Sequence, residues 1–333
     1  MNASKKRRTL VAWILVMTLL ASGVSWLGWD RYASGSWTTA SVTVDLPPNE
    51  DVSVLRSHLE QALPPEGSRV LQHLDWRGWE SRLKPGRYTF DLGETVKESA
   101  VRLVTGNREA VRVVVPSGRD VGPIAGGAAR HVFADSAKLA EWLVQDSVMW
   151  RVLPNTYEMW WESDAEALVD RLLREHQLWW NEDRVAAARA QGLTPKEATV
   201  LASIVQAETA ALDEAPTVAG LYLNRLNKGM ALQADPTLIY ALGDPSIRRV
   251  LDVHKDIESP YNTYKYRGLP PGPIRYVDPR YIQSVLHPAS HRHLYMCAEP
   301  GGTGTHRFAS SYREHLRNAR DYQAWLNQQR IFR

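Results

Sequence analysis

Residues 194–209 read Thr194-Pro-Lys-Glu-Ala-Thr-Val-Leu-Ala-Ser-Ile-Val-Gln-Ala-Glu208-Thr209, and this stretch carries a strong helix signal. Thr194 followed three residues later by Glu197 forms a capping box, and Pro195 occupies the first helical position. Apolar residues then recur at helical spacing and predict a buried stripe, made of Leu201, Ile204, Val205 and Leu212. We therefore predict a helix that begins at about residue 195 and lies with one face in the core.

Glu208 lies on this apolar stripe, because it follows Leu201, Ile204 and Val205 by seven, four and three residues. Burial disfavours the charged form of a carboxylate and raises its pKa. A carboxyl group that keeps its proton near neutral pH can act as a general acid. Alternatively, Glu208 pairs with an arginine or caps a neighbouring segment, since structural ion pairs also place acids on apolar faces. The helix by itself leaves both roles open.

The composition is that of a globular protein with room for two domains. Of the 333 residues, 44% are hydrophobic and 23% are charged. The formal charge of +3 comes from the cluster Lys5–Arg8, because the chain beyond it has 36 basic and 37 acidic residues. This balance excludes a basic bias toward nucleic acid. Cys297 is the single cysteine, so no intrachain disulfide can form.

The N-terminus predicts a membrane anchor. Residues 9–29 carry no charge, and these 21 residues match the roughly 20 that a membrane-spanning helix needs. Trp26 and Trp29 suit the far interface, and the Lys5–Arg8 cluster favours a cytoplasmic N-terminus. A cleaved signal peptide with its cut near residues 21–23 is the alternative, but the apolar run exceeds the usual h-region of about 7–15 residues.

These features predict a single-pass membrane protein whose main part, residues 30–333, lies outside the cytoplasm. The predicted segments are a cytoplasmic tail at 1–8, a transmembrane helix at 9–29, a linker at 30–40, an α/β module at 41–110 and a larger domain at 111–333 with its core at about 190–333. The predicted class is α+β. Helices are expected at 51–63, 94–104, 163–180, 216–226 and 312–328, and strands at 40–46, 86–90, 111–115 and 294–297.

Polar side chains in the larger domain are candidates for ligand binding. Asn224, Arg225, Gln233 and Asp235 lie within apolar sequence and need partners if they are buried. They form a hydrogen-bonding wall for substrate, an internal network that holds the loop, or both. Residues 255–280 are rich in proline and tyrosine and predict a long irregular loop. Tyrosine and tryptophan side chains suit sugar rings, although packing explains most of the 13 tryptophans. The best candidates for ligand contact are Tyr261, Tyr264 and Tyr266 in this loop.

No cofactor or metal is expected from the sequence. The histidines His287, His291 and His293 match no zinc signature, and the HEXXH motif is absent. The glycine-rich residues 301–304 lack the pattern of a phosphate-binding loop and predict a hairpin turn.

Several motifs together resemble the endolytic murein transglycosylases, the MltG or YceG-like family. They are Pro154–Tyr157, Leu201–Thr209, Asn224–Leu226, Leu232–Thr237, Ser259–Tyr264, Gly268–Ile274, His287-Pro288, Gly304–Phe308 and Glu314-His315. Their order and spacing are similar to those of the family and cover most of the chain beyond the anchor. The resemblance implies a periplasmic enzyme anchored in the inner, or plasma, membrane, with a LysM-like first module and a mixed α+β transglycosylase domain.

The resemblance also implies the site residues. The family's catalytic glutamate corresponds to Glu208, and this chain has Gln206 where many members carry a second glutamate. Asn155 stands where an aspartate is common. The residues implied to orient the glycan are Asn224, Arg225, Gln233, Asp235, Tyr261, Asn262, Thr263 and Tyr264.

The implied activity is that of a lytic transglycosylase, a carbon–oxygen lyase that cleaves the MurNAc–GlcNAc bond of nascent peptidoglycan and leaves 1,6-anhydroMurNAc ends. Such cleavage would terminate strand elongation, and penicillin-binding synthases are the implied partners. The main alternative is a non-catalytic scaffold that binds peptidoglycan and recruits cell-wall synthases. A metal-dependent wall hydrolase is a third possibility.

Overall fold

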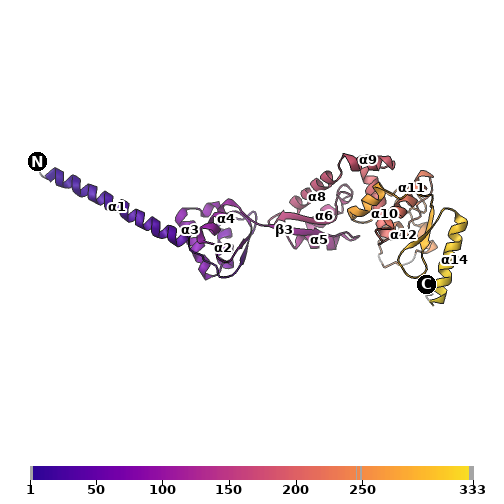
Figure 1. Cartoon of the computed structure of the whole chain (residues 1–333), viewed down its shortest axis with the longest axis horizontal. Coiled ribbons are helices and arrows are strands. Elements are labelled where there is room, and N and C mark those ends of the chain that lie inside the picture. The colour runs from indigo at the N-terminus through magenta and orange to yellow at the C-terminus, as the bar shows by residue number, and fades with distance from the viewer. Residues whose placement is uncertain (1–2, 245, 248–249, 330–333) are drawn as a thin grey trace. The chain divides into compact units, whose positions relative to one another are not determined.

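The computed structural model describes residues 3–244, 246–247 and 250–329. The chain divides into two compact units (Figure 1). The first unit comprises Met1–Arg112, His131–Phe133 and Glu158–Ser163, and the second comprises Val113–Arg130, Ala134–Tyr157 and Asp164–Arg333. The fold is of the mixed α+β class, as the sequence predicts.

The N-terminal helix α1 (Ala3–Ala33) is one continuous helix and includes the predicted apolar segment. Among the described residues it is the one helix that is long and apolar enough to cross a membrane, by length and composition. Its side chains from Trp13 to Gly28 are exposed, whereas Ala33 is fully buried. The end of α1 therefore belongs to the packed part of the first unit.

The first unit is a small antiparallel sheet covered by helices. Its elements after α1 are β1 (Val42–Leu46), α2 (Val52–Ala62), η1 (Pro65–Gly67), α3 (Ser68–Arg77), η2 (Glu80–Arg82), β2 (Gly86–Phe90) and α4 (Val96–Thr105). Strands β1 and β2 pair antiparallel, with Val44 opposite Tyr88. The alternation of side chains along a strand puts Val44 and Leu46 of β1 and Tyr88 and Phe90 of β2 into one core.

Residues 30–40, for which the sequence predicts a linker, contain the last turn of α1 and a segment packed on the first unit. Trp37 is 3% exposed, and its indole N–H donates a 2.8 Å hydrogen bond to Ser99. The backbone of Ser36 forms an antiparallel bridge with Thr95. Serine and glycine in this segment gave the appearance of a free tether, but the aromatic ring at Trp37 anchors it in the core.

Strands β3 (Ala110–Val115) and β4 (Asn155–Trp160) form a second two-stranded sheet, and the boundary between the units falls within both strands. The remaining elements are α5 (Val121–Ala129), α6 (Ser136–Leu143), α7 (Asp146–Met149), α8 (Ala165–Trp179), α9 (Glu182–Ala190), α10 (Pro195–Glu208), α11 (Ala215–Asn227), α12 (Asp235–Leu242), η3 (Asp252–Asp256), α13 (Pro279–Leu286), β5 (Tyr295–Ala298), β6 (His306–Ala309) and α14 (Tyr312–Gln328). Helix α10 packs against α9, α11, α12 and α13.

The predicted start of α10 is confirmed in detail. The Thr194 hydroxyl accepts the Glu197 N–H, and the Glu197 carboxylate accepts the Thr194 N–H, so both halves of the capping box are present. The stripe residues Leu201, Ile204 and Val205 are fully buried. The predicted continuation to Leu212 is wrong, because the helix ends at Glu208.

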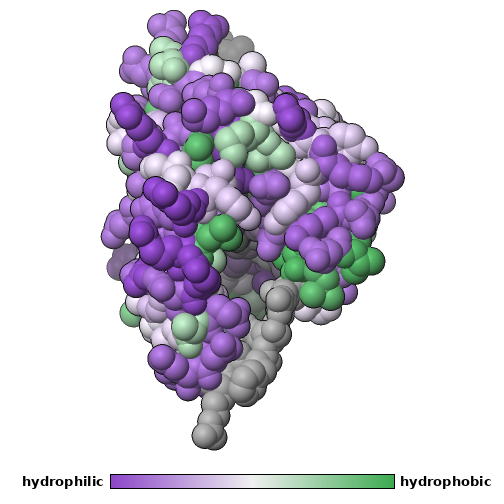
Figure 2. Space-filling model, turned by 90° about the vertical axis from the view of Figure 1, so that its right-hand side faces the viewer, coloured by the Kyte–Doolittle hydropathy of each residue, from purple (hydrophilic) through white to green (hydrophobic). Residues whose placement is uncertain are grey.

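Two further expectations can be compared with the structure. The helix predicted at 163–180 is α8, which begins at Ala165, and Asp164 caps it by accepting the Ala167 N–H. The predicted hairpin turn at residues 301–304 is confirmed, because it joins β5 to β6, which pair antiparallel. On the face shown in Figure 2 the surface is mostly hydrophilic, and hydrophobic side chains form small separate groups.

Candidate active site

Glu208 is the last residue of α10, at the point where the buried stripe reaches a cavity. Its carboxyl group is partly exposed to this cavity. The Tyr222 hydroxyl of the next helix, α11, donates a 2.6 Å hydrogen bond to Glu208 Oε1. Tyr222 is only 2% exposed, so its phenol is held in place by the core. The two consecutive helices thus fix the position of one carboxylate oxygen.

The surroundings of Glu208 raise its pKa to about 7, chiefly because burial disfavours the charged form. The hydrogen bond from Tyr222 acts in the opposite direction and lowers this pKa. The negative charge of Asp235 raises it further, while His306 and Arg225 lower it. A carboxyl group with this pKa is protonated in a large share of molecules at neutral pH, as a general acid must be.

The cavity at Glu208 has a volume of about 230 Å³. Its walls come from α10, α11, α12, β5 and β6, together with the loop before α12 and the long loop that carries Tyr264. The lining residues are Glu208, Leu221, Tyr222, Arg225, Leu232, Gln233, Asp235, Tyr264, Met296, Cys297, Ala298 and His306. Four of the eight residues predicted to contact substrate therefore line the cavity, namely Arg225, Gln233, Asp235 and Tyr264.

Asp235 and Tyr264 form a polar wall of the cavity. The Tyr264 hydroxyl donates a hydrogen bond to Asp235 Oδ1, which joins the long loop to the first turn of α12. Gln233 lies beside them with a φ of 51°, in the left-handed region that few residues other than glycine adopt. Non-glycine residues in this region cost roughly 1–3 kcal/mol and cluster at functional sites. This conformation therefore supports the assignment of Gln233 to a binding wall.

Arg225 contributes positive charge to the cavity while it holds three backbone carbonyl groups. Its Nε donates to the Leu294 oxygen at 2.6 Å, and its Nη1 donates to the oxygens of Leu232 and Ala231 at 2.6 and 3.4 Å. The side chain is 8% exposed. Arg225 therefore ties α11 to β5 and to the loop that carries Gln233.

His306, which lines the cavity, is paired with the carboxylate of Glu214. Glu214 Oε2 lies 2.9 Å from His306 Nδ1, and Glu214 Oε1 accepts the His306 backbone N–H at 2.6 Å. Both side chains are largely buried. Two contacts from one carboxylate fix the orientation of the ring.

The other four predicted substrate residues do not line the cavity. Asn224 donates to the His291 and His293 carbonyl oxygens, and Tyr261 packs against Tyr240 with ring centroids 4.8 Å apart. The fully buried Asn262 and the 2% exposed Thr263 bind the backbone of the long loop and of α12. In this structure these side chains hold the walls of the cavity in place. Asn224 therefore belongs to an internal network, which is one of the two roles that the sequence predicts for it.

Gln206 lies outside the cavity as well. Its amide oxygen accepts the Asp278 N–H at 3.0 Å, and its amide nitrogen donates to Ser117 at 3.2 Å. Asn155 lines a separate cavity beside Trp179. Of the histidines considered for a metal, His291 contacts the Thr217 carbonyl oxygen at 2.9 Å. Within the described ranges, no group of three or more histidine, cysteine, aspartate or glutamate side chains could hold a metal ion.

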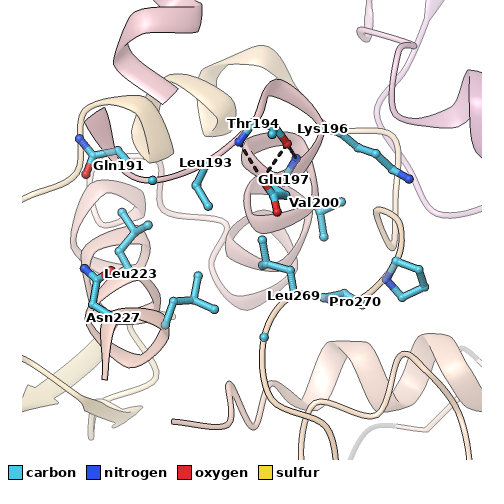
Figure 3. A pocket seen from close by; sticks show the side chains of 14 residues that line it. Gln191, Leu193, Thr194, Lys196, Glu197, Val200, Leu223, Asn227, Leu269 and Pro270 are labelled. Carbon is cyan, nitrogen blue, oxygen red and sulfur yellow. Dashed lines mark hydrogen bonds between the residues drawn. The ribbon is translucent and has the colours of Figure 1, made fainter. Parts of the chain in front are cut away.

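A larger groove lies at the opposite end of α10 and has a volume of about 620 Å³. Figure 3 shows that it is lined by the start of α10, the end of α11 and the loop around Leu269 and Pro270. Glu197 faces this groove, but its carboxylate is bound in the capping box with Thr194. Among the described residues of this groove the one carboxylate is engaged in the cap of α10, so the smaller cavity is the better candidate.

Sequence reasoning gave no role in the site to four of the residues that line or support it. Tyr222 and Glu214 carry no motif of their own in the sequence, and Cys297 was noted only as a single cysteine. His306 was noted only as part of the Gly304–Phe308 motif. Burial raises the pKa of the Cys297 thiol, which makes it a slow nucleophile.

The polar cavity around a carboxyl group with a raised pKa defines this α+β chain as a protein with a candidate acid catalyst. The family model of the YceG-like family matches residues 44–321. The chain belongs to the YceG-like family.

Curated relatives and a solved structure agree with this membership. An endolytic murein transglycosylase of Streptococcus pneumoniae (strain ATCC BAA-255 / R6) is 28% identical over 179 residues, which are 51% of this chain and 31% of that protein. One of Bacillus subtilis (strain 168) is 37% identical over 122 residues, which are 37% of this chain and 33% of that protein. The matches thus span about a third of the length of these relatives.

The fold is also similar to a crystal structure of a YceG-like protein from Listeria monocytogenes. The TM-score is 0.53 at 23% sequence identity, and the match covers 84% of this chain and 99% of that chain. At this level of identity the likeness supports the fold.

Proposed function

We propose that this protein is an endolytic lytic transglycosylase that cleaves the MurNAc–GlcNAc bond of nascent peptidoglycan strands. The observation that carries the proposal is the Glu208 carboxyl group, whose pKa is about 7 in a polar cavity. Family membership and the names of the curated relatives support peptidoglycan as the substrate.

The proposed reaction begins with proton donation by Glu208. Because Oε1 accepts the hydrogen bond from Tyr222, Oε2 is the oxygen that would carry the transferable proton. This proton would pass to the glycosidic oxygen as the bond from C1 of the muramyl ring to that oxygen breaks. Positive charge would then develop on the muramyl ring.

The second half of the reaction would return the proton to Glu208. The C6 hydroxyl of the same ring attacks C1, and the Glu208 carboxylate accepts the hydroxyl proton. The products are a 1,6-anhydroMurNAc end and a free GlcNAc hydroxyl, no water is consumed, and Glu208 regains its initial state. Intramolecular attack has a high effective molarity, so the chain needs no protein nucleophile.

The cavity walls would bind and orient the sugar rings. Gln233, Asp235 and Tyr264 would offer hydrogen bonds to the hydroxyl and acetamido groups, and Arg225 would contribute positive charge. Tyr222 is a positioning residue in this scheme. Asn224, Tyr261, Asn262 and Thr263 would act through the walls that they hold in place.

We also propose the setting in which the enzyme acts. Helix α1 would be a single-pass anchor in the inner membrane with a cytoplasmic N-terminus, and the catalytic unit would be periplasmic. The order β1-α2-α3-β2 in the first unit supports a LysM-like module. Cleavage close to the membrane would end strand elongation, with penicillin-binding synthases as partners.

The test is a digest of uncrosslinked nascent glycan by the full chain, analysed by mass spectrometry. We expect anhydro-ended products, each lighter by one water than the reducing end that a hydrolase leaves. Reducing ends would show a hydrolase instead, and loss of cleavage with EDTA would show a metal-dependent enzyme. Glycan binding without cleavage would favour the scaffold alternative.

A further inference from the structure

The last turn of α1 is clamped to one face of α3. Residues 69, 72, 73 and 76 of α3 follow the spacing of a single helical face. Arg69 donates to the Tyr32 carbonyl oxygen at 2.8 Å, and its guanidinium lies 4.3 Å above the Tyr32 ring. The Tyr32 hydroxyl also contacts Gln72 at 3.2 Å. The end of α1 is therefore fixed to the first unit by polar and aromatic contacts.

Trp29 extends these contacts to the end of α3. Its ring centroid lies 5.2 Å from that of Trp76, and its ring stacks on His73 at 6.2 Å. His73 is buried, whereas Trp76 is 45% exposed. An exposed tryptophan thus sits beside the last residue of the uncharged segment 9–29.

The length of α1 sets the depth at which this cluster lies. The 21 uncharged residues span about 31 Å at 1.5 Å per residue, which equals the roughly 30 Å hydrocarbon core of a bilayer. Trp29 would then lie at the outer boundary of the core. The head-group layer beyond it is about 5–8 Å thick. The Trp76 ring lies 5.2 Å from the Trp29 ring, so Trp76 lies no farther from the hydrocarbon core than the head-group layer extends.

The neighbouring side chains have the composition of a membrane interface. The Arg77 guanidinium lies 5.6 Å from the Trp76 ring and 4.6 Å from the Trp79 ring, and the Arg82 guanidinium lies 5.6 Å from the Trp79 ring. In the described part of the chain neither arginine forms an ion pair with an acidic side chain, so both can bind lipid phosphate. Tryptophan rings are enriched at this depth because they have an apolar body and a polar N–H.

We propose that the surface formed by Trp29, Trp76, Trp79, Arg77 and Arg82 docks on the lipid head-group layer of the membrane that α1 crosses. The first unit is then held against the bilayer at the end of its anchor, and residues 30–40 do not act as a tether. This inference rests on the proposed anchoring by α1 and is independent of the catalytic role of Glu208. A sugar ring could also stack on Trp76, but the contact with Trp29 ties this surface to the end of the anchor and favours lipid.

The test measures the depth of spin labels in the full chain, reconstituted in nanodiscs of phosphatidylethanolamine and phosphatidylglycerol. In a Cys297→Ser background, single labels are placed through Trp76→Cys and Arg77→Cys, and the second keeps the Trp76 ring. Leu20→Cys reports on the middle of α1. Ala110→Cys is the aqueous control, because Ala110 is exposed and β3 begins on the side of the first unit away from α1 (Figure 1).

The measured quantity is the ratio of collisions with oxygen to collisions with a water-soluble nickel complex at each label. We expect this ratio to be several-fold higher for the labels at positions 76 and 77 than for the label at position 110, and highest for the label at position 20. If the label at position 20 is buried in lipid while the labels at 76 and 77 give the same ratio as the label at 110, α1 is an anchor and the docking proposal is overturned. If the label at position 20 also gives the ratio of the aqueous control at 110, the anchoring and the docking are both overturned. The proposed chemistry of Glu208 does not depend on either result. Restriction of label 76 by added glycan, without contact with lipid, would likewise overturn the proposal.

Discussion

The two ends of α10 carry the same residue type in opposite circumstances. Glu197, in the first turn, is exposed, and its carboxylate is fully engaged with Thr194. Glu208, three turns later, is surrounded by core residues and by Tyr222, and its pKa is about 7. The same side chain is therefore a structural cap at one end of the helix and a candidate acid catalyst at the other.

The end of α10 that carries the candidate acid has the smaller of the two cavities. The groove at Glu197, drawn in Figure 3, has a volume of about 620 Å³, whereas the cavity at Glu208 has a volume of about 230 Å³. Size therefore does not identify the reactive site in this fold. What distinguishes the smaller cavity is a desolvated carboxyl group with a fixed hydrogen-bond donor and a second carboxylate, Asp235, close enough to influence its protonation.

The largest effect is expected from removal of the acid. Glu208→Gln should lower the rate of glycan cleavage by at least about 10²- to 10⁴-fold, the usual contribution of a general acid. Glu197→Gln is the matched control, because glutamine also serves at this position of a capping box. It should retain activity within about twofold of wild type. Similar losses in both variants, measured as initial rates of product formation, would contradict the distinction between the two ends.

The second effect concerns the hydrogen bond from Tyr222. Since this bond lowers the Glu208 pKa, Tyr222→Phe should raise it above 7. Activity requires the protonated acid and falls as pH rises through this pKa, so the high-pH limb of the pH–rate profile should move upward by about one unit. Tyr240→Phe, on a tyrosine that packs against Tyr261, should leave the limb in place. An unmoved limb in Tyr222→Phe would contradict the positioning role.

Removal of the charge on Asp235 is expected to shift the Glu208 pKa by a smaller amount and in the opposite direction. The negative charge of Asp235 raises the Glu208 pKa, so Asp235→Asn should lower it and move the high-pH limb downward by less than one unit. The amide oxygen of asparagine can still accept the Tyr264 hydroxyl, which keeps the wall intact. The pH–rate profiles of Asp235→Asn and Tyr222→Phe should therefore move apart. Movement of both in the same direction would show that the charge on Asp235 does not act on Glu208.

The smallest effect on activity is expected at the other end of the helix. Thr194→Ala removes the cap and should destabilise the second unit by about 1 kcal/mol. Calorimetry of the full chain would measure this loss as a lower transition temperature. The cleavage rate at a temperature where the protein stays folded should be unchanged. A large loss of activity would mean that the groove in Figure 3 takes part in the reaction.

The sequence predicted the elements whose signals are local. The cap at Thr194, the buried stripe of α10 and the terminal helix α14 depend on residues within a few turns of one another, and each appears in the structure. The partial burial of Glu208 follows from the same periodicity. Local patterns of this kind are fixed by helical geometry before any tertiary contact is known.

The partners of Glu208 could not be predicted in the same way. Tyr222 is 14 residues away on a second helix, and the pairing of Glu214 with His306 joins residues 92 apart. These contacts depend on how the helices and the β5–β6 hairpin pack. Asn224 and Arg225 are both polar residues in an apolar helix, and both bind backbone carbonyl groups. Arg225 also lines the cavity, whereas Asn224 does not. The pattern reports burial of a polar group and does not reveal its partner.

The proposed role of Glu208 as the acid depends on the protonation of its carboxyl group, and a direct titration tests this protonation. Carbon-13 NMR of glutamate-labelled protein, with Glu208→Gln used to assign the signal, would follow the carboxyl group through its titration. The predicted result is a pKa of about 7. A pKa near the ordinary glutamate value of 4.5 would leave Glu208 ionised at neutral pH and would contradict its role as the acid.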